Sequence, residues 1–342
     1  MFTPFFMTKT DAEESPIEYQ EKEIYRPQEI IIKQAELNIN KGNTVLSHNP
    51  KPMNLDEFVG QSANKQSIRT TIKIIQQIKP VNIFIHGYPG CGKSTLAEII
   101  SNELDANFIY TIPEQLKNLE KVTEIINNIQ ENKKLTVWMV DECHTIDKKF
   151  VNILLPILQD HRLGDVIIRE FVMIMATTDY NKLYKKSEAL ISRFQTKIYL
   201  EKYTIEEIVL ILKQYNSKMN LKIIIPEEDF LFIANNSKGI PREAINLLLK
   251  RYVTHNVNEV LQENKIVRNG INESDIKILN VLNQVKSPIG ANFLSQRASM
   301  LESDYLYIYE PFLVEKGFID RTKSGRMITE SGKKFLKELK NE

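Results

Sequence analysis

The chain has 342 residues, of which 42% are hydrophobic and 26% are charged, and its formal net charge is +1 at pH 7. This length allows roughly two or three domains with cores of their own, and the composition excludes a largely disordered protein. Because the net charge is close to zero, we expect no general attraction to nucleic acids or membranes. Any binding to phosphate groups must come from locally clustered basic residues.

The two cysteines, Cys91 and Cys143, offer neither a disulfide framework nor the spacing of a zinc site. The first residues, MFTPFFMTKTDAEE, place no basic residue ahead of their short apolar stretch. The chain also has no run of about 18 apolar residues, the length that a membrane span requires. We therefore expect a reduced, cytoplasmic protein with no membrane partner.

The first 200 residues fall into two parts. Residues 1–52 are rich in Glu, Lys, Gln and Asn with weak periodicity, and we interpret them as a partly ordered extension. In residues 53–202, short β-rich runs alternate with helical stretches, which is typical of a parallel sheet covered by helices. The sequence predicts an α/β fold here, with strands at 81–87, 107–112, 135–142, 170–178 and 196–200.

After these strands the pattern becomes helical. Thr204 and Glu207 have the spacing of a capping box, so a helix is predicted to begin there. Residues 203–266 are predicted to form a small helical lid domain, in which Gly239 caps one helix and a further helix runs from 242 to about 265.

The C-terminal part, residues 267–342, has a different layout. It opens with a predicted linker at 267–274. Three helical segments follow, and then a hairpin with a glycine turn. This order of elements predicts a winged-helix domain, with helices at 273–284, 291–299 and 304–317.

The clearest motif is GYPGCGKS at 87–94, which satisfies the P-loop pattern between an apolar strand and a helix. Its glycines allow backbone N–H groups and the helix N-terminus to point at a phosphate. The Lys93 ammonium would neutralise the outer phosphates, and the Ser94 hydroxyl would bind Mg²⁺. The predicted residues for ATP and Mg²⁺ are Gly87, Pro89, Gly90, Cys91, Gly92, Lys93, Ser94 and Thr95.

Acidic residues end the strand predicted at 135–142. Asp141 is predicted to hold Mg²⁺ through water, and Glu142 to orient and activate the water that attacks the γ-phosphate. We interpret the nearby His144 as a structural or coupling residue and not as a catalytic base.

Three more polar residues are expected near the nucleotide. Thr178, with Thr177, ends the strand at 170–178 and is predicted to hydrogen-bond the γ-phosphate or its water. Arg193 precedes the last strand, where an arginine can reach the γ-phosphate of a neighbouring subunit. Arg242 opens a helix of the lid domain and is predicted to clamp the nucleotide from above.

The segments GYPGCGKST, VDECH, ATT, SRF and GIPRE occur in the order used by AAA+ ATPases. The strings at 54–61, NLDEFVGQ, and at 308–326, IYEPFLVEKGFIDRTKSGR, resemble the RuvB family of Holliday-junction branch-migration ATPases. The resemblance covers about residues 53–337. It implies a sensor 1 residue, a trans-acting arginine finger, a sensor 2 residue, an adenine pocket and two DNA contacts. Thr178 would be the sensor 1 residue, Arg193 the arginine finger and Arg242 the sensor 2 residue. Leu55, Phe58 and Val59 would help to form the adenine pocket, and Arg321 and Arg326 would contact DNA.

The wing itself is compatible with this DNA contact. Arg321, Lys323 and Arg326 lie on a turn with no acidic residue from 321 to 329, as a hairpin that follows phosphates requires. A solvated basic turn is the alternative. The aromatic residues of the preceding helix have helical spacing and are predicted to be core and not base-stacking groups: Tyr305, Tyr307, Tyr309 and Phe312.

One segment departs from the family pattern. Between the helix at 150–160 and the strand at 170–178, RuvB proteins usually carry a longer hairpin that contacts the partner RuvA. Here only HRLGDVIIR at 161–169 remains. This shortening weakens the case for a RuvA-like partner.

Together, the resemblance implies an ATP-dependent translocase on duplex or junction DNA that works as a homo-oligomer, a hexameric ring. A clamp-loader-like or helicase-loader ATPase is the alternative because it shares every nucleotide motif, although a winged-helix C-terminus argues against it. The intact Glu142 disfavours a regulator that only binds ATP. A DExH helicase is rejected because no second RecA-like domain follows.

Overall fold

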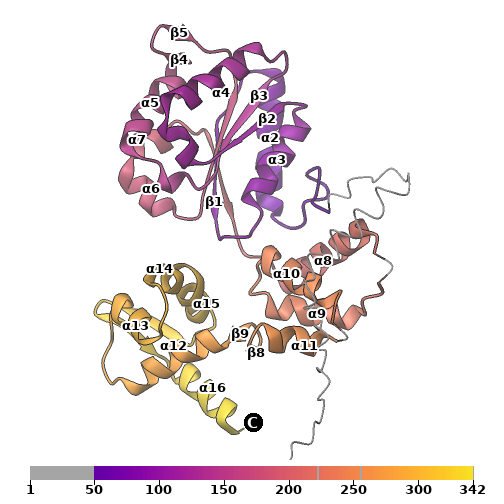
Figure 1. Ribbon diagram of the computed structural model, residues 1–342, viewed down its shortest axis with the longest axis vertical. Coiled ribbons are helices and arrows are strands. Elements are labelled where there is room, and N and C mark those ends of the chain that lie inside the picture. Colours follow the sequence, from indigo (N-terminus) through magenta and orange to yellow (C-terminus); the bar gives the residue numbers. More distant parts are fainter. Residues whose placement is uncertain (1–49, 222, 255, 342) are drawn as a thin grey trace, which may run out of the picture. The chain divides into compact units, whose positions relative to one another are not determined.

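The computed structural model describes residues 50–341 apart from 222 and 255, so the predicted extension lies almost wholly outside the described residues. Within that part of the chain, no helix is long and apolar enough to cross a membrane. The first element group is an α/β domain, coloured indigo to pink in Figure 1. Its main strands are β1 (Ile83–Gly87), β2 (Asn107–Thr111), β3 (Thr136–Val140), β6 (Val172–Thr177) and β7 (Thr196–Leu200).

These five strands form one sheet in the order β2-β3-β6-β1-β7, and every neighbouring pair is parallel. They lie within the five predicted segments, so the sequence pattern correctly predicted the parallel sheet. Helices connect the strands, because parallel neighbours need a crossover. The helices are α2 (Ser62–Gln77), α3 (Lys93–Glu103), α4 (Leu119–Glu131), α5 (Lys148–Asp160), α6 (Tyr180–Lys186) and α7 (Glu188–Ile191).

Alternation along the strands creates two cores. Ile83 and Ile85 of β1 belong to the cluster that includes α2 and α3, whereas Phe84 between them belongs to the cluster that includes α4 and α5. Successive side chains of a strand point to opposite faces, so helices on both faces are needed to bury them. Figure 1 shows these two pairs of helices on either side of the sheet.

The shortened segment after α5 forms a small antiparallel hairpin, made of β4 (Arg162–Leu163) and β5 (Val166–Ile167). The side chains of Val166 and Ile167 are exposed. The short segment therefore forms a two-stranded hairpin whose second strand exposes two apolar side chains.

The next domain is helical, as predicted. Its capping box forms: the Glu207 N–H donates to the Thr204 hydroxyl at 3.2 Å, and the Thr204 N–H donates to the Glu207 carboxylate at 2.9 Å. The helix predicted from 242 to about 265 was wrong, because Asn256 caps a new helix by accepting from the Glu259 N–H at 3.0 Å. The helices are α8 (Ile205–Met219), α9 (Glu227–Asn236), α10 (Pro241–Arg251) and α11 (Val257–Glu263).

The predicted linker was also wrong, since it forms a hairpin of β8 (Ile266–Arg268) and β9 (Ile271–Asn272). The turn residues Asn269 and Gly270 have φ values of 48° and 78°. Asn-Gly is the pair that tolerates positive φ at both positions of a tight hairpin turn. This local signal was readable in the sequence but was interpreted only as a linker.

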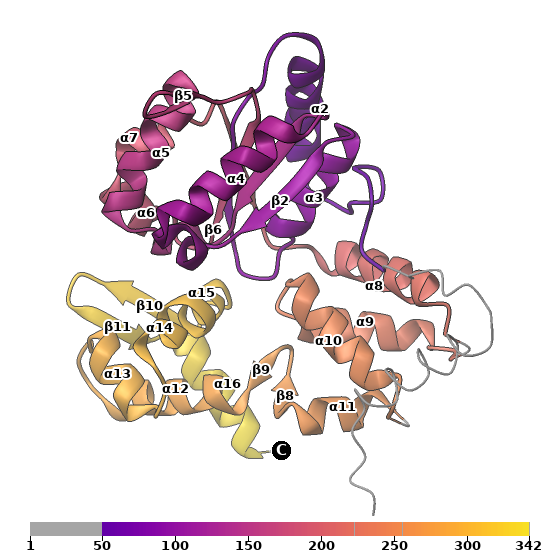
Figure 2. The same ribbon diagram turned by 45° about the horizontal axis from the view of Figure 1, so that its top comes forward.

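The last domain has the predicted winged-helix layout, with its hairpin visible in Figure 2. A π-helix at Tyr305–Tyr309 interrupts the third predicted helix. Tyr305 and Phe312 are core residues as predicted, whereas Tyr307 is 49% exposed, so the core prediction was wrong for that residue. The other elements are α12 (Glu273–Gln284), α13 (Ala291–Arg297), α14 (Glu302–Asp304), α15 (Glu310–Glu315), β10 (Ile319–Thr322), β11 (Gly325–Ile328) and α16 (Glu330–Asn341).

Candidate nucleotide site and DNA-binding wing

The P-loop joins β1 to α3, which begins at Lys93. The lid domain approaches this loop closely, since the Arg242 N–H donates to the Gly90 carbonyl at 3.3 Å. Gly90 has a φ of 79°, and a Cβ there would lie 2.8 Å from the Ile240 side chain. Only glycine fits this backbone conformation and this contact. The first N–H groups of α3 have no partners within the helix and are suited to bind phosphate.

Lys93 is held inside the loop. Its side chain is buried, and its ammonium donates to the carbonyls of Gly87 at 3.2 Å and Tyr88 at 3.1 Å. Desolvation lowers the pKa of Lys93, while the negative charges of Glu142 and Asp141 oppose that shift. A bound phosphate would supply the anion that this desolvated cation favours.

The two predicted Mg²⁺ residues meet. The Ser94 hydroxyl donates to the Asp141 carboxylate at 2.8 Å, and the Tyr110 hydroxyl donates to the same oxygen at 3.2 Å. A hydroxyl beside a carboxylate is the oxygen set that Mg²⁺ takes from proteins when phosphates and waters complete its shell. The residues present therefore fit this ion, and Tyr110 is a neighbour that sequence reasoning missed.

Glu142 lies in the left-handed region with a φ of 46°, a rare conformation for a residue with a side chain. Its Oε2 accepts from the Thr178 N–H at 3.2 Å and from the Thr178 hydroxyl at 2.9 Å. Burial raises the pKa of Glu142, but hydrogen bonds from His144 and Thr178, with the charge of Lys93, outweigh it and lower the pKa to about 2. The carboxylate is therefore ionised and fixed in direction.

His144 links this carboxylate to the sensor strand. Its Nδ1 lies 3.2 Å from Oε2 of Glu142 and 3.0 Å from the Thr177 hydroxyl oxygen. The same hydroxyl accepts from the Asp179 N–H at 3.0 Å. These contacts are consistent with the structural or coupling role predicted for His144.

The nucleotide cavity encloses about 480 Å³ between the P-loop, Glu142 and the lid helices. Phe58, Val59 and Arg242 line it. Leu55 does not line it: this side chain is 3% exposed and packs in the core, so its place in the adenine pocket stays a prediction. Sequence reasoning also missed four apolar and aromatic residues that line the cavity: Tyr203, Ile211, Tyr215 and Ile245. Of these, Ile211 and Tyr215 lie four residues apart on one face of α8.

The loop cysteine is part of this structure and carries no charge. Burial raises the pKa of the Cys91 thiol to about 11, and its carbonyl accepts from the Tyr203 hydroxyl at 3.2 Å. A protonated, buried thiol is a poor nucleophile, so Cys91 serves here as a small apolar residue that fills space in the loop.

Arg193 does not line the cavity of its own P-loop. One of its terminal nitrogens donates to the Gln159 side chain at 2.7 Å. Its Nε is buried without a hydrogen-bond partner among the described residues. An arginine away from its own nucleotide is what a residue acting on a neighbouring subunit requires.

The three basic wing residues differ in their surroundings. Glu310 of α15 is 1% exposed and accepts from the Arg326 Nε at 2.6 Å and from Arg321 at 3.0 Å. The Arg326 side chain is 23% exposed and that of Arg321 is 54% exposed, while Lys323 is also exposed. Arg326 therefore braces the wing, whereas Arg321 and Lys323 are available at its surface.

A P-loop after β1, an acidic pair after β3, a polar strand end on β6 between these two strands and a helical lid define a P-loop ATPase of the AAA+ type, joined here to a winged helix. Two family models match the chain: the Holliday junction DNA helicase RuvB P-loop domain at residues 50–197 and the RuvB C-terminal winged helix domain at 268–337. The chain belongs to the RuvB family.

Individual relatives agree with this assignment. The Holliday junction branch migration complex subunit RuvB of Mycoplasmopsis pulmonis is 31% identical over 316 residues, covering 84% of this chain and 98% of the relative. The subunit of the same name from Thermotoga maritima is 29% identical over 314 residues, covering 84% of this chain and 92% of the relative. The solved Thermotoga maritima RuvB Holliday junction branch migration motor matches with a TM-score of 0.73 at 29% identity, covering 84% of this chain and 98% of that one.

Proposed function

We propose that this chain is an ATP-driven DNA translocase that moves Holliday junctions, working as a closed hexameric ring. The observation that carries the proposal is the ionised Glu142 held by Thr178 beside a complete P-loop, in a chain that ends in a winged helix. Such a carboxylate has a use only if ATP is hydrolysed. Relatives named for Holliday junction branch migration support the choice of substrate.

The chain's own residues account for the hydrolytic step. The P-loop amides and Lys93 bind the phosphates, and Glu142 accepts a proton from the attacking water. Thr178 holds that carboxylate in place, because its hydrogen bonds fix one of the two oxygens. Mg²⁺, held by Ser94 and Asp141, would neutralise charge on the phosphates.

The proposal of a ring of subunits rests on Arg193. A guanidinium that stabilises charge on a neighbour's γ-phosphate makes hydrolysis depend on assembly and lets one subunit sense the nucleotide of the next. Arg193 fits this role because it does not line its own cavity and its Nε has no partner in the described chain. Six subunits in a closed ring would place one active site at each interface.

The wing is the proposed grip on DNA. Arg321 and Lys323 are exposed on β10 and its turn, where they can contact phosphates without reading sequence. Arg326 is proposed to act mainly through Glu310, by keeping the hairpin in place, and its side chain is only 23% exposed. This division lets the ring move along DNA of any sequence.

Besides DNA, a RuvA-like junction-binding protein is the second partner to consider. The hairpin β4–β5 is short, but it presents Val166 and Ile167 as exposed apolar side chains. We propose it as the docking point if such a partner is present. The double variant Val166→Asp with Ile167→Asp would then lose stimulation by that partner and keep the ATPase rate measured with DNA alone.

The rival function is a clamp-loader-like or helicase-loader ATPase, which shares the nucleotide residues. The experiment that separates the two is the ATPase rate together with particle mass, alone and with linear duplex or four-way junction DNA. Ring-sized particles and hydrolysis stimulated by DNA support the translocase. Hydrolysis that ignores DNA, in a monomer or pentamer, supports the loader.

A further inference from the structure

A hydrogen bond joins the winged helix to the loop that follows β6 and carries Thr178. The hydroxyl of Tyr307 donates to Oδ2 of Asp179 at 2.7 Å, although 128 residues separate them in sequence. Asp179 directly follows Thr178 and caps α6, because its other oxygen accepts from the Lys182 N–H at 2.9 Å. Tyr307 of the winged helix is thus hydrogen-bonded to Asp179, which follows Thr178 in the chain. Thr178 in turn holds the catalytic carboxylate of Glu142.

On the nucleotide side, this contact continues to Glu142 through a chain of polar contacts. The Asp179 N–H binds the Thr177 hydroxyl, which lies 3.0 Å from Nδ1 of His144. His144 and Thr178 both contact Oε2 of Glu142. A shift of the loop at 177–179 would therefore move two of the groups that fix the carboxylate.

On the DNA side, the π-helix Tyr305–Tyr309 is tied to the wing. The buried Tyr305 hydroxyl donates to Glu310 at 3.3 Å, and Glu310 binds both Arg321 and Arg326. A carboxylate that is 1% exposed cannot release these arginines without a large cost, so the wing and this helix move together. Isolated π-helical turns inside α-helices frequently occur at functional sites.

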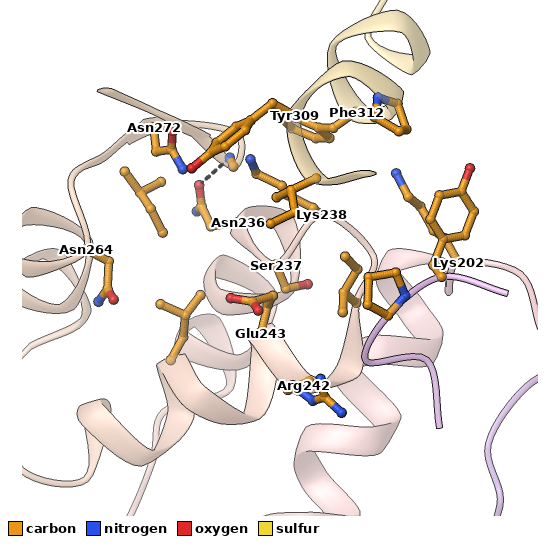
Figure 3. Close-up of a pocket in the computed structure, with 18 of the residues that line it drawn as sticks. Lys202, Asn236, Ser237, Lys238, Arg242, Glu243, Asn264, Asn272, Tyr309 and Phe312 are labelled. Atoms are coloured by element: carbon orange, nitrogen blue, oxygen red, sulfur yellow. Dashed lines mark hydrogen bonds between the residues drawn. The ribbon is translucent and has the colours of Figure 1, made fainter. Parts of the chain in front are cut away.

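A second contact lies beside the first. Glu315 of α15 forms an ion pair with Lys202, whose ammonium also lies 4.9 Å from the ring centroid of Tyr88 in the P-loop. Figure 3 shows Tyr309 and Phe312 near Lys238 in the adjoining cavity, with Lys202 at its right-hand side. The same helical segment thus touches residues next to both phosphate-sensing loops.

We propose that the π-helix Tyr305–Tyr309 couples the wing to the nucleotide site, and that Tyr307 is the positioning residue that makes DNA affinity depend on the bound nucleotide. This inference rests on the proposed function, because it requires DNA on the wing. Loss or gain of the γ-phosphate changes the loop at 177–179, the Tyr307 contact passes that change to Glu310, and Glu310 passes it to Arg321. By linkage, DNA on the wing favours the same loop position in return.

The test is the affinity of the full-length protein for a labelled linear duplex, measured with ATPγS and with ADP. The variants are Tyr307→Phe, which removes one hydroxyl and keeps the ring, and the matched control Tyr309→Phe. Within the described residues the Tyr309 hydroxyl has no hydrogen bond, and its ring lies over Lys238. The wild-type Kd values should differ at least about fivefold between the two nucleotides, the lower end of ordinary coupling. Tyr307→Phe should bring this ratio close to one, and Tyr309→Phe should leave it unchanged.

A double-mutant cycle adds a second readout. Asp179→Asn keeps an oxygen that can cap α6 but weakens the bond to Tyr307. If the two residues act through one contact, the double variant loses no more coupling than Tyr307→Phe alone. Coupling losses that add would overturn the proposal, as would a wild-type Kd ratio in Tyr307→Phe or equal Kd values in the wild type. An ATPase rate that ignores DNA would instead contradict the proposed function.

Discussion

The side chain of Thr178 donates to Glu142 at 2.9 Å, and its backbone N–H donates to the same oxygen at 3.2 Å. The sequence predicted that Thr178 would contact the γ-phosphate or its water. In the structure it instead holds the carboxylate of Glu142, which is predicted to activate that water. Both roles are compatible if the γ-phosphate draws the hydroxyl away from Glu142 when ATP binds. Thr178 then reports the presence of the γ-phosphate directly to the catalytic group.

Glu142→Gln is expected to keep ATP binding and to lose turnover. The amide has nearly the shape of the carboxylate but cannot accept a proton from water, and such a loss typically costs about 10²- to 10⁴-fold in rate. Steady-state ATPase rates and nucleotide Kd values on the same sample check this. Turnover within twofold of wild type would contradict the assignment.

Arg193→Ala is expected to bind ATP normally but to hydrolyse it poorly, because the residue acts on a neighbouring subunit. The sharper test mixes this variant with Glu142→Gln. Neither hydrolyses well alone, but a mixed ring contains interfaces where an intact Glu142 meets an intact Arg193. Recovery of ATPase activity on mixing is expected. No recovery in mixed rings of confirmed composition would contradict action between subunits.

The pH dependence of hydrolysis should lack an acidic limb from Glu142. Its pKa is lowered to about 2, so the carboxylate remains ionised above roughly pH 4. Its hydrogen bonds favour the folded state above the unfolded pKa of 4.5, and this contribution is lost as pH falls toward 2.

Thr178→Val removes one of the hydrogen bonds that lower this pKa. The variant should therefore show an acidic limb at higher pH than the wild type in a kcat profile. A kcat profile of Thr178→Val that coincides with the wild-type profile over the whole acidic range would contradict this prediction.

Glu310→Gln is expected to destabilise the winged helix, because it leaves two arginines without their charged partner. Loss of a charge-assisted hydrogen bond at a buried group costs about 1–3 kcal/mol. Thermal unfolding measures the effect, and the surface variant Glu330→Gln, whose partner is the exposed Lys333, serves as the control. Equal unfolding temperatures for the two variants would show that Glu310 is not a structural centre.

DNA affinity should fall steeply with salt, since phosphate contacts release counterions. Removing one phosphate contact reduces the slope of log K against log salt by about 0.9 on duplex DNA. Arg321→Ala and Lys323→Ala should each show this reduction. The control is Lys334→Ala on α16, a basic residue of the same domain outside the wing. An unchanged slope in both wing variants would place the DNA elsewhere.

The arrangement of the candidate nucleotide site was largely predictable, because most of its residues lie in short sequence motifs. The P-loop and the pair Asp141 and Glu142 depend on local spacing, so their approach follows once the parallel strands are in register. Contacts between distant segments were not predictable in this way. Leu55 turned inward to the core, and the partners Glu310 and Tyr307 have no signal in spacing alone.

Two local errors had readable causes. The Asn-Gly pair at 269–270 indicated a hairpin, and Asn256 indicated a new helix start. The π-helix differs, because it inserts an extra residue in a turn that still looks amphipathic. Helical spacing predicts Tyr307 on the side that faces the core, but in the π-helix its side chain is exposed.

The most direct test of the translocase assignment is the movement of a synthetic four-way junction into duplex products, followed with labelled strands. The wild-type protein should move the junction with ATP and not with ATPγS or ADP, and Glu142→Gln should fail with all three while still binding the junction. Movement that is equal with and without hydrolysable ATP, or no movement by ring-sized particles that hydrolyse ATP on the same DNA, would contradict the account.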